Sequence, residues 1–231
     1  MEELPRLEPA AVDPSGHLAQ IMLTTILHFP RPAQGGDIIS WGPMNPAPRF
    51  SDAVAFAAEL HGGQNRKASG APYLAHLLGV AAIVLEHGGT EDEAIAALLH
   101  DAVEDQGGAA VREEIRRRFG DRVAEIVDGC SDTDQIPKPP WKDRKKTHLE
   151  RLRCADPSIL LVVAADKLHN ARALLRQYRI EGEALWVQFR GGRQGTKWYF
   201  RSVVELLKQS LDSPLVEELE SAVAELEQLV G

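Results

Sequence analysis

Cysteine is scarce in this chain of 231 residues, in which Cys130 and Cys154 are the only two. They form no Cys-x-x-Cys pair, so neither a framework of disulfide bonds nor a zinc site built from thiolates is indicated. We interpret both cysteines as reduced thiols in a cytoplasmic protein.

A surplus of positive charge is also absent, because 34 Asp and Glu outnumber 26 Lys and Arg and give a formal net charge of −8. Neither nucleic acid nor an anionic membrane is therefore an expected partner, and any phosphate-binding patch must be local. Long apolar runs are missing too. The stretch Leu18–Phe29 is too short to span a bilayer, and acidic residues such as Glu2 and Glu3 precede it where a secretory signal carries basic ones.

Proline is concentrated in the first 48 residues, which lack any sustained hydrophobic period. Eight of the 14 prolines lie there: Pro5, Pro9, Pro14, Pro30, Pro32, Pro43, Pro46 and Pro48. Such a segment gains too little burial to offset the entropy lost on ordering. We therefore predict a loosely ordered tail over residues 1–48, with one short helix near Leu18–Leu27, and a single folded domain over residues 49–231.

From Phe50 onward the apolar residues recur at helical spacing and no strand-like alternation is present, which predicts an all-α fold. Thr90 and Glu93 form a predicted capping box for the helix that carries His100 and Asp101 and continues to Gly107. The other expected helices are one capped by Ser51 or Asp52 and ending at His61, then 73–86, 109–119, 121–128, 141–153 and 159–175, two segments separated by Gly191-Gly192, and one from Ser213-Pro214 to Val230.

The stretch Ala96–Asp105 concentrates titratable groups. His100 and Asp101 offer an imidazole nitrogen and a carboxylate oxygen, a mixed pair that suits a divalent transition metal. On a continuous helix Glu104 lies one turn beyond His100, and Asp105 lies one turn beyond Asp101. The preceding apolar residues predict burial, and a buried carboxylate needs a partner such as a metal. The alternative for a single His-Asp pair is an ordinary exposed helix end.

Two further candidates lie on other helices. A histidine such as His76, on a half-apolar helix, is by itself more often a core residue. Asp166 follows the apolar run Ile159–Ala165, so its carboxylate needs compensation from a metal or from an ion pair with Lys or Arg. Asn170 lies one turn further on the same face. Two imidazoles and two carboxylates without a thiolate fit Mn²⁺ or Fe²⁺ as well as Zn²⁺.

The order of His76, His100-Asp101 and Asp166 resembles the H…HD…D pattern of the HD-domain phosphohydrolases. Longer motifs at residues 61–76, 97–105 and 165–170 extend the resemblance to the hydrolase domain of the RelA/SpoT stringent-response proteins, and especially to the small stand-alone alarmone hydrolases. The similarity covers residues 50–211, and HDxxED followed by ADKLHN is a specific combination. The resemblance implies an HD-domain helical bundle and, without the bulk of a synthetase domain, no alarmone synthesis.

The resemblance also implies a role for particular residues. The implied Mn²⁺ ligands are His76, His100, Asp101 and Asp166. Glu104 and Asp105 are implied to activate the attacking water. Asn170 is implied to contact the nucleotide, and Arg66 or Lys67 to lie beside its base. One more residue than usual separates the Arg-Lys pair from Pro72-Tyr73, so the choice between the two stays open.

A pyrophosphate group on an acidic protein needs local cations, and Arg66 and Lys67 are two candidates. A second group of cations consists of Lys142, Arg144, Lys145 and Lys146. We predict that Arg144 and Lys145 bind substrate, whereas the alternative for this group is a solvated helix face. The aromatic residues within Gly182–Tyr199 either wall the pocket or belong to the core.

The function that the resemblance implies is metal-dependent hydrolysis of the 3′-pyrophosphate of (p)ppGpp to GDP or GTP and pyrophosphate. A second possibility keeps the site and changes the nucleotide: an adenosine alarmone, a phosphate such as that of NADPH, or a deoxynucleotide. A third is a metal-bound nucleotide sensor without turnover, against which the intact pair Glu104-Asp105 counts. In each case the expected partner is a small nucleotide.

Overall fold

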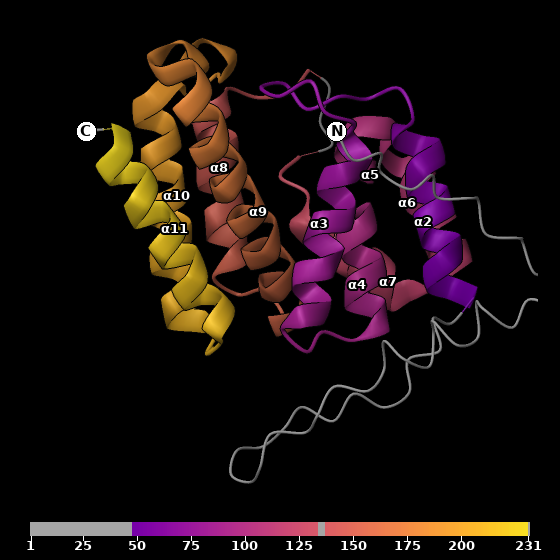
Figure 1. The fold of residues 1–231 in the computed structure, drawn as a ribbon. Helices are drawn as coiled ribbons and strands as arrows, with labels where there is room; N and C mark the ends of the chain where they lie inside the picture. The colour runs from indigo at the N-terminus through magenta and orange to yellow at the C-terminus, as the bar shows by residue number, and fades with distance from the viewer. Residues whose placement is uncertain (1–47, 134–136, 231) are drawn as a thin grey trace, which may run out of the picture. The chain divides into compact units, whose positions relative to one another are not determined.

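The computed structural model describes residues 48–133 and 137–230, which belong to one compact unit, Trp41–Gly231. The predicted tail up to residue 47, with its short helix near Leu18–Leu27, lies outside the described residues. The elements (Figure 1) are α2 Pro48–His61, α3 Tyr73–Glu86, α4 Glu91–Leu99, α5 Ala102–Gln106, α6 Gly108–Phe119, α7 Asp121–Cys130, α8 Trp141–Leu152, α9 Pro157–Glu181, the 3₁₀ helix η1 Gly182–Gln188, α10 Gly192–Ser210 and α11 Pro214–Val230.

Helices joined by loops make up the described part of the chain, whose only β pairing is an isolated bridge between Asn65 and Pro72. The all-α prediction is confirmed. The predicted capping box is also present, because the amide of Glu93 donates to Thr90 and the amide of Thr90 donates to the Glu93 carboxylate. Among the described helices, none combines the length and the hydrophobicity of a membrane-spanning segment.

Several helix boundaries differ from the prediction, and two of them have a clear local reason. Helix α2 begins at Pro48 rather than after a Ser51 or Asp52 cap. Proline suits this position, because the amide hydrogen that it lacks would have no partner in the first turn of a helix. Helix α9 continues past Leu175 to Glu181, since nothing interrupts it before Gly182, whose φ of 59° ends it.

Helix α9 organises the packing, because it contacts α3, α4, α7, α10 and α11. Figure 1 shows it between the α10–α11 pair and the α3–α4 pair. Its N-terminus is capped by the Asp156 carboxylate, which accepts a hydrogen bond from the Ser158 amide at 2.9 Å. This central position places the middle of α9, where Asp166 lies, among buried neighbours on several sides.

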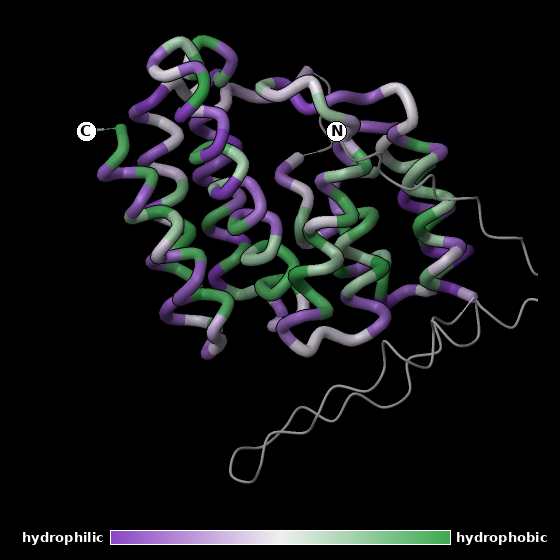
Figure 2. Tube along the Cα trace, viewed as in Figure 1, coloured by the Kyte–Doolittle hydropathy of each residue, from purple (hydrophilic) through white to green (hydrophobic). Residues whose placement is uncertain are grey.

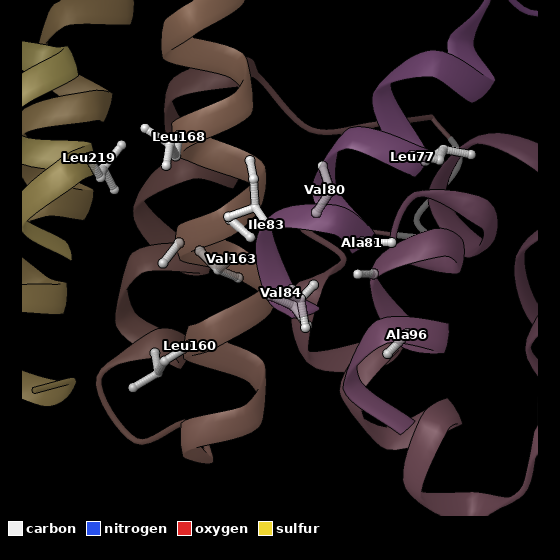
Figure 3. Close-up of a cluster of buried hydrophobic side chains, with 14 of the residues drawn as sticks. Leu77, Val80, Ala81, Ile83, Val84, Ala96, Leu160, Val163, Leu168 and Leu219 are labelled. Atoms are coloured by element: carbon white, nitrogen blue, oxygen red, sulfur yellow. The ribbon is translucent and has the colours of Figure 1, made fainter. Parts of the chain in front are cut away.

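The core around α9 is made of aliphatic side chains from different helices. Figure 3 shows Val80 and Val84 of α3, Val163 and Leu168 of α9, and Leu219 of α11, all of them buried. Figure 2 shows α3 and α4 as largely hydrophobic, whereas α10 and α11 alternate between hydrophobic and hydrophilic residues. The helices that carry the predicted metal ligands are thus held on apolar surfaces, which is the rigid support that a site of buried polar groups requires.

Candidate functional site

The predicted continuous helix through His100 and Asp101 is two helices, because α4 ends at Leu99 and α5 begins at Ala102. His100 Nδ1 lies 2.8 Å from the carbonyl oxygen of Ala97. In an uninterrupted α-helix that oxygen would accept the amide of Asp101, so the imidazole engages this acceptor where the helix ends. The expectation of one helix is wrong, and Asp101 is the N-cap residue of α5.

The structure brings the four predicted metal ligands together from α3, the α4–α5 junction and α9. His76 Nε2 lies 3.3 Å from Asp166 Oδ1 and 3.9 Å from Asp101 Oδ2. His100 Nε2 lies 3.0 Å from Asp101 Oδ2 and 3.7 Å from Asp166 Oδ1. One donor atom each from His76, His100 and Asp101 lie within 4.8 Å of one another, so these side chains could hold a metal ion.

Two buried nitrogen atoms in this cluster support a cation. The Nε2 atoms of His76 and His100 are buried and have no hydrogen-bond partner among the described residues. The Nδ1 of His100 faces the Ala97 carbonyl, so in the neutral imidazole Nδ1 carries the proton and Nε2 keeps its lone pair. Imidazole lone pairs that converge with carboxylate oxygens are the donor set of a divalent cation. The residues therefore fit a metal ion.

The titration of the cluster leads to the same conclusion. Burial alone would lower the pKa of His100, but the Asp101 and Asp166 carboxylates raise it well above its usual range. Burial opposes ionisation of Asp166 as well, yet the Lys167 ammonium and the two imidazoles hold its pKa well below the usual range. The cluster attracts positive charge, whether from a proton or from a metal.

The ion pair that the sequence allowed as an alternative for Asp166 is present alongside the cluster. Lys167 Nζ lies 2.5 Å from Asp166 Oδ2, while Oδ1 faces the histidines. Asn170 also donates to Oδ1 and in turn accepts a hydrogen bond from Arg66 Nη2 at 2.7 Å. The Asp166 carboxylate thus has one oxygen paired with Lys167 and the other directed at the candidate metal position.

The two predicted catalytic carboxylates lie beside the cluster on α5. Glu104 accepts a hydrogen bond from Lys138 Nζ at 2.9 Å, and Arg144 Nη1 lies 3.5 Å from the same carboxylate. Burial and the neighbouring Asp132 carboxylate raise the pKa of Glu104 despite Lys138. Asp105 accepts a hydrogen bond from Gln64 Nε2 at 3.0 Å. Both carboxylates line the same cavity as His76, Asp101 and Asp166.

That cavity has a volume of about 640 Å³ and a charged wall. Its basic residues, within the described part of the chain, are Arg66, Lys67, Lys138, Arg144, Lys145, Lys167, Arg176 and Arg190. Its acidic residues are Asp101, Glu104, Asp105, Asp132 and Asp166. Eight basic groups against five acidic ones make the cavity locally basic on an acidic protein, as a phosphate-binding site requires.

The group of cations on α8 divides into two parts. Arg144 is buried and Lys145 half-buried, and both pair with the Asp132 carboxylate, Lys145 at 2.7 Å. Lys142 and Lys146 are exposed. The solvated helix face is therefore correct for the latter two, whereas the residues predicted to bind substrate face the cavity.

The two predicted base-side residues are placed differently. Arg66 is half-buried, donates to Asn170 and lies over the ring of Tyr73, with its Cζ 5.7 Å from the ring centroid. Lys67 is exposed, although it also lines the cavity.

The aromatic residues after α9 divide between core and cavity. Phe189 and Tyr199 line the cavity, whereas Trp186 is buried and packs between Tyr178 and Phe189. Both alternatives for this segment therefore hold: Trp186 belongs to the core, Phe189 lines the cavity, and Tyr199 does both.

Several residues of the site were not predicted from the sequence. Asp132 and Lys138 lie in the segment between α7 and α8, where no helical period marks them. His169 belongs to the ADKLHN motif and lies near Asp166 on α9, and that spacing was a signal that could have indicated it. Its Nδ1 lies 2.9 Å from Nδ1 of His76.

The helical bundle, with His and Asp side chains lining a basic cavity, has the arrangement expected of a metal-dependent phosphohydrolase. A family model described as HD domain matches residues 53–197, and the chain belongs to this HD-domain family. The resemblance expected from the motifs is confirmed.

Similar proteins carry more specific names. Over 174 residues the chain is 35% identical to mouse guanosine-3′,5′-bis(diphosphate) 3′-pyrophosphohydrolase MESH1, a match that covers 71% of this chain and 93% of the mouse protein. A guanosine-3′,5′-bis(diphosphate) 3′-pyrophosphohydrolase of Aquifex aeolicus is 39% identical over 131 residues, covering 55% of this chain but only 18% of that longer protein.

A solved structure is similar as well. It is described as "A metazoan ortholog of SpoT hydrolyzes ppGpp and plays a role in starvation responses", and it superimposes with a TM-score of 0.66 at 27% identity. The match covers 78% of this chain and 97% of that one.

Proposed function

We propose that this protein hydrolyses the 3′-pyrophosphate of (p)ppGpp, releasing GDP or GTP and pyrophosphate. The observation that carries the proposal is the buried His/Asp cluster at the floor of a cavity whose wall is basic. The mouse relative, matched over 93% of its length, is named for the same reaction. The proposal extends to a folded domain over residues 49–231, preceded by a separate tail, in a cytoplasmic protein.

The proposed resident metal is Mn²⁺, with Fe²⁺ and Zn²⁺ as alternatives. The residues that would hold it are His76, His100, Asp101 and Asp166. When bound, such an ion lowers the pKa of a water molecule and polarises a phosphoryl oxygen. The two imidazoles and two carboxylates supply nitrogen and oxygen donors without a thiolate, which is compatible with all three metals.

In this mechanism Glu104 is the general base, and Asp105 supports it. A raised pKa makes the Glu104 carboxylate a better proton acceptor than an ordinary glutamate at neutral pH. Lys138 and Arg144 lie next to Glu104, so the proposed base stands beside positively charged groups that also attract phosphate. The hydrogen bond from Gln64 orients Asp105 toward the cavity.

The cations of the wall would bind the substrate. Arg66 and Asn170, which form a hydrogen-bonded pair, would contact the nucleotide, with Lys67 at the exposed edge of the cavity. Arg144 and Lys145 would bind the phosphate groups. Charge-assisted hydrogen bonds to phosphate are strong and directional, so a nucleotide with phosphates at both the 5′ and 3′ positions suits this wall better than a monophosphate.

The test is a substrate panel with added Mn²⁺, in which free pyrophosphate and free phosphate are resolved. The panel contains ppGpp, GMP, an adenosine alarmone, NADPH and a deoxynucleotide. We expect pyrophosphate from ppGpp and at most slow release from the others. Equal KM values for ppGpp and GMP would remove the basis for the alarmone substrate, and binding of ppGpp without any turnover would favour the sensor.

A further inference from the structure

A third imidazole lies beside the His/Asp cluster and is not one of the four predicted metal ligands. His169 is on α9, and its Nδ1 is 2.9 Å from Nδ1 of His76 on α3. The two ring centroids are 4.8 Å apart, with 55° between the ring planes. His76 therefore faces the cluster with one nitrogen and His169 with the other.

The chemistry of an imidazole ligand makes this second contact consequential. To donate its Nε2 lone pair to a metal, His76 must carry its proton on Nδ1, and that proton then needs an acceptor. Nδ1 of His169 is at hydrogen-bond distance and supplies one. His100 meets the same requirement differently, because its Nδ1 faces the backbone carbonyl of Ala97 at 2.8 Å.

The fold leaves a specific space for the His169 ring. A Cβ built on Gly79 would lie 2.5 Å from both Cδ2 and Nε2 of His169, closer than van der Waals contact allows. Gly79 follows His76 by three residues on α3, so the two share a face of that helix. The imidazole occupies space that a side chain at residue 79 would take.

We propose that His169 is a positioning residue that fixes the tautomer and orientation of His76 for metal binding, and that Gly79 is the gap that admits its ring. This inference rests on the proposed function only in assuming that the His/Asp cluster binds a metal. It concerns neither the nucleotide nor the chemical step.

The test measures Mn²⁺ affinity of the full chain without nucleotide, by competition with a fluorescent chelator. His169→Phe keeps a ring but removes the acceptor, and Gly79→Ala displaces the ring without changing either histidine. Both variants should lose about 10–100-fold in Mn²⁺ affinity, the usual effect of removing the partner of a ligating histidine. His169→Gln, whose amide oxygen can accept the proton, should recover most of the loss.

Gly63→Ala is the matched control, because a Cβ at that position would have no neighbour within 4 Å. It should bind Mn²⁺ like the wild type. Thermal unfolding of the metal-free proteins should show that His169→Gln and His169→Phe are equally folded, so that stability does not account for their different affinities.

The outcomes separate this inference from the proposed function. If wild type and His169→Phe bind Mn²⁺ equally well, the positioning role is wrong while the metal site stands. If His169→Gln is as weak as His169→Phe, hydrogen-bond acceptance is not what His169 contributes, and the inference also fails. If the wild type binds no divalent metal, the proposed metal site itself is overturned, and this inference with it.

Discussion

The His/Asp cluster and the basic wall of the cavity are held in place by different kinds of contact. The cluster residues lie on helices packed through aliphatic side chains, and their donors are fixed by short local contacts such as that of His100 with the Ala97 carbonyl. The wall is held mainly by ion pairs and hydrogen bonds at the cavity surface, such as Lys138 with Glu104 and Arg66 with Asn170.

This difference separates what must stay fixed from what can exchange partners. The cluster tolerates no missing donor, because removing one leaves the remaining, mostly buried polar groups without a partner. A half-exposed ion pair contributes little net stability, so its cation can leave one carboxylate and bind a phosphate instead. We therefore expect changes in the cluster to abolish metal binding and turnover, and changes in the basic residues of the wall to weaken substrate binding.

The largest effect is expected from His100→Ala. A ligand set reduced to three loses both affinity and geometry, so metal content and pyrophosphate release should fall together to background. Metal analysis of the purified variant and a pyrophosphate-release assay provide the check. Full activity of metal-stripped wild type in EDTA would place the cluster outside the reaction.

The next largest effect is expected from Glu104→Gln, which is nearly isosteric but cannot accept a proton. The variant should keep its metal and lose about 10²–10⁴-fold in kcat. If it instead loses its metal, Glu104 is a ligand and the division between cluster and wall is drawn in the wrong place.

A smaller effect, on KM rather than on kcat, is expected from Arg66→Ala. Losing one charge-assisted contact should raise KM for ppGpp about ten-fold or more while metal content stays intact. Lys67→Ala is the comparison, and because Lys67 is exposed its effect should be weaker. The reverse order would assign the base-side role to Lys67.

The smallest of the four effects is expected in the folding stability of Asp132→Asn. Burial opposes ionisation of Asp132, but Lys145 and Arg144 lower its pKa. A lowered folded pKa stabilises the protein above the unfolded pKa, near 4, and this contribution is lost as the pH falls through the folded value. Chemical unfolding should show the wild type more stable by about 1–3 kcal/mol at pH 7, and by less below pH 4. A difference that does not change with pH would mean that the Asp132 charge contributes nothing.

The same division explains which parts could be predicted from the sequence. Helix α3, Tyr73–Glu86, has the predicted bounds, because an apolar period between a proline and a Gly pair determines them locally. The four cluster residues could be selected because they stand out chemically against apolar helices.

Contacts between distant segments could not be predicted in this way. Helix α4 ends where the His100 imidazole contacts the Ala97 carbonyl, and the spacing of hydrophobic residues does not indicate such a contact. Lys138 and Glu104 are 34 residues apart in sequence, and His169 and His76 are 93 apart. Such pairs depend on how helices pack, which is a property of the tertiary structure rather than of any local pattern.

The most direct test of the proposed metal centre is an anomalous difference map from crystals of the protein grown with Mn²⁺ and measured at the manganese edge. We predict one strong peak in contact with Nε2 of His76, Nε2 of His100 and carboxylate oxygens of Asp101 and Asp166. A peak elsewhere in the cavity, or none at this cluster despite full Mn²⁺ occupancy in solution, would contradict the proposed metal centre.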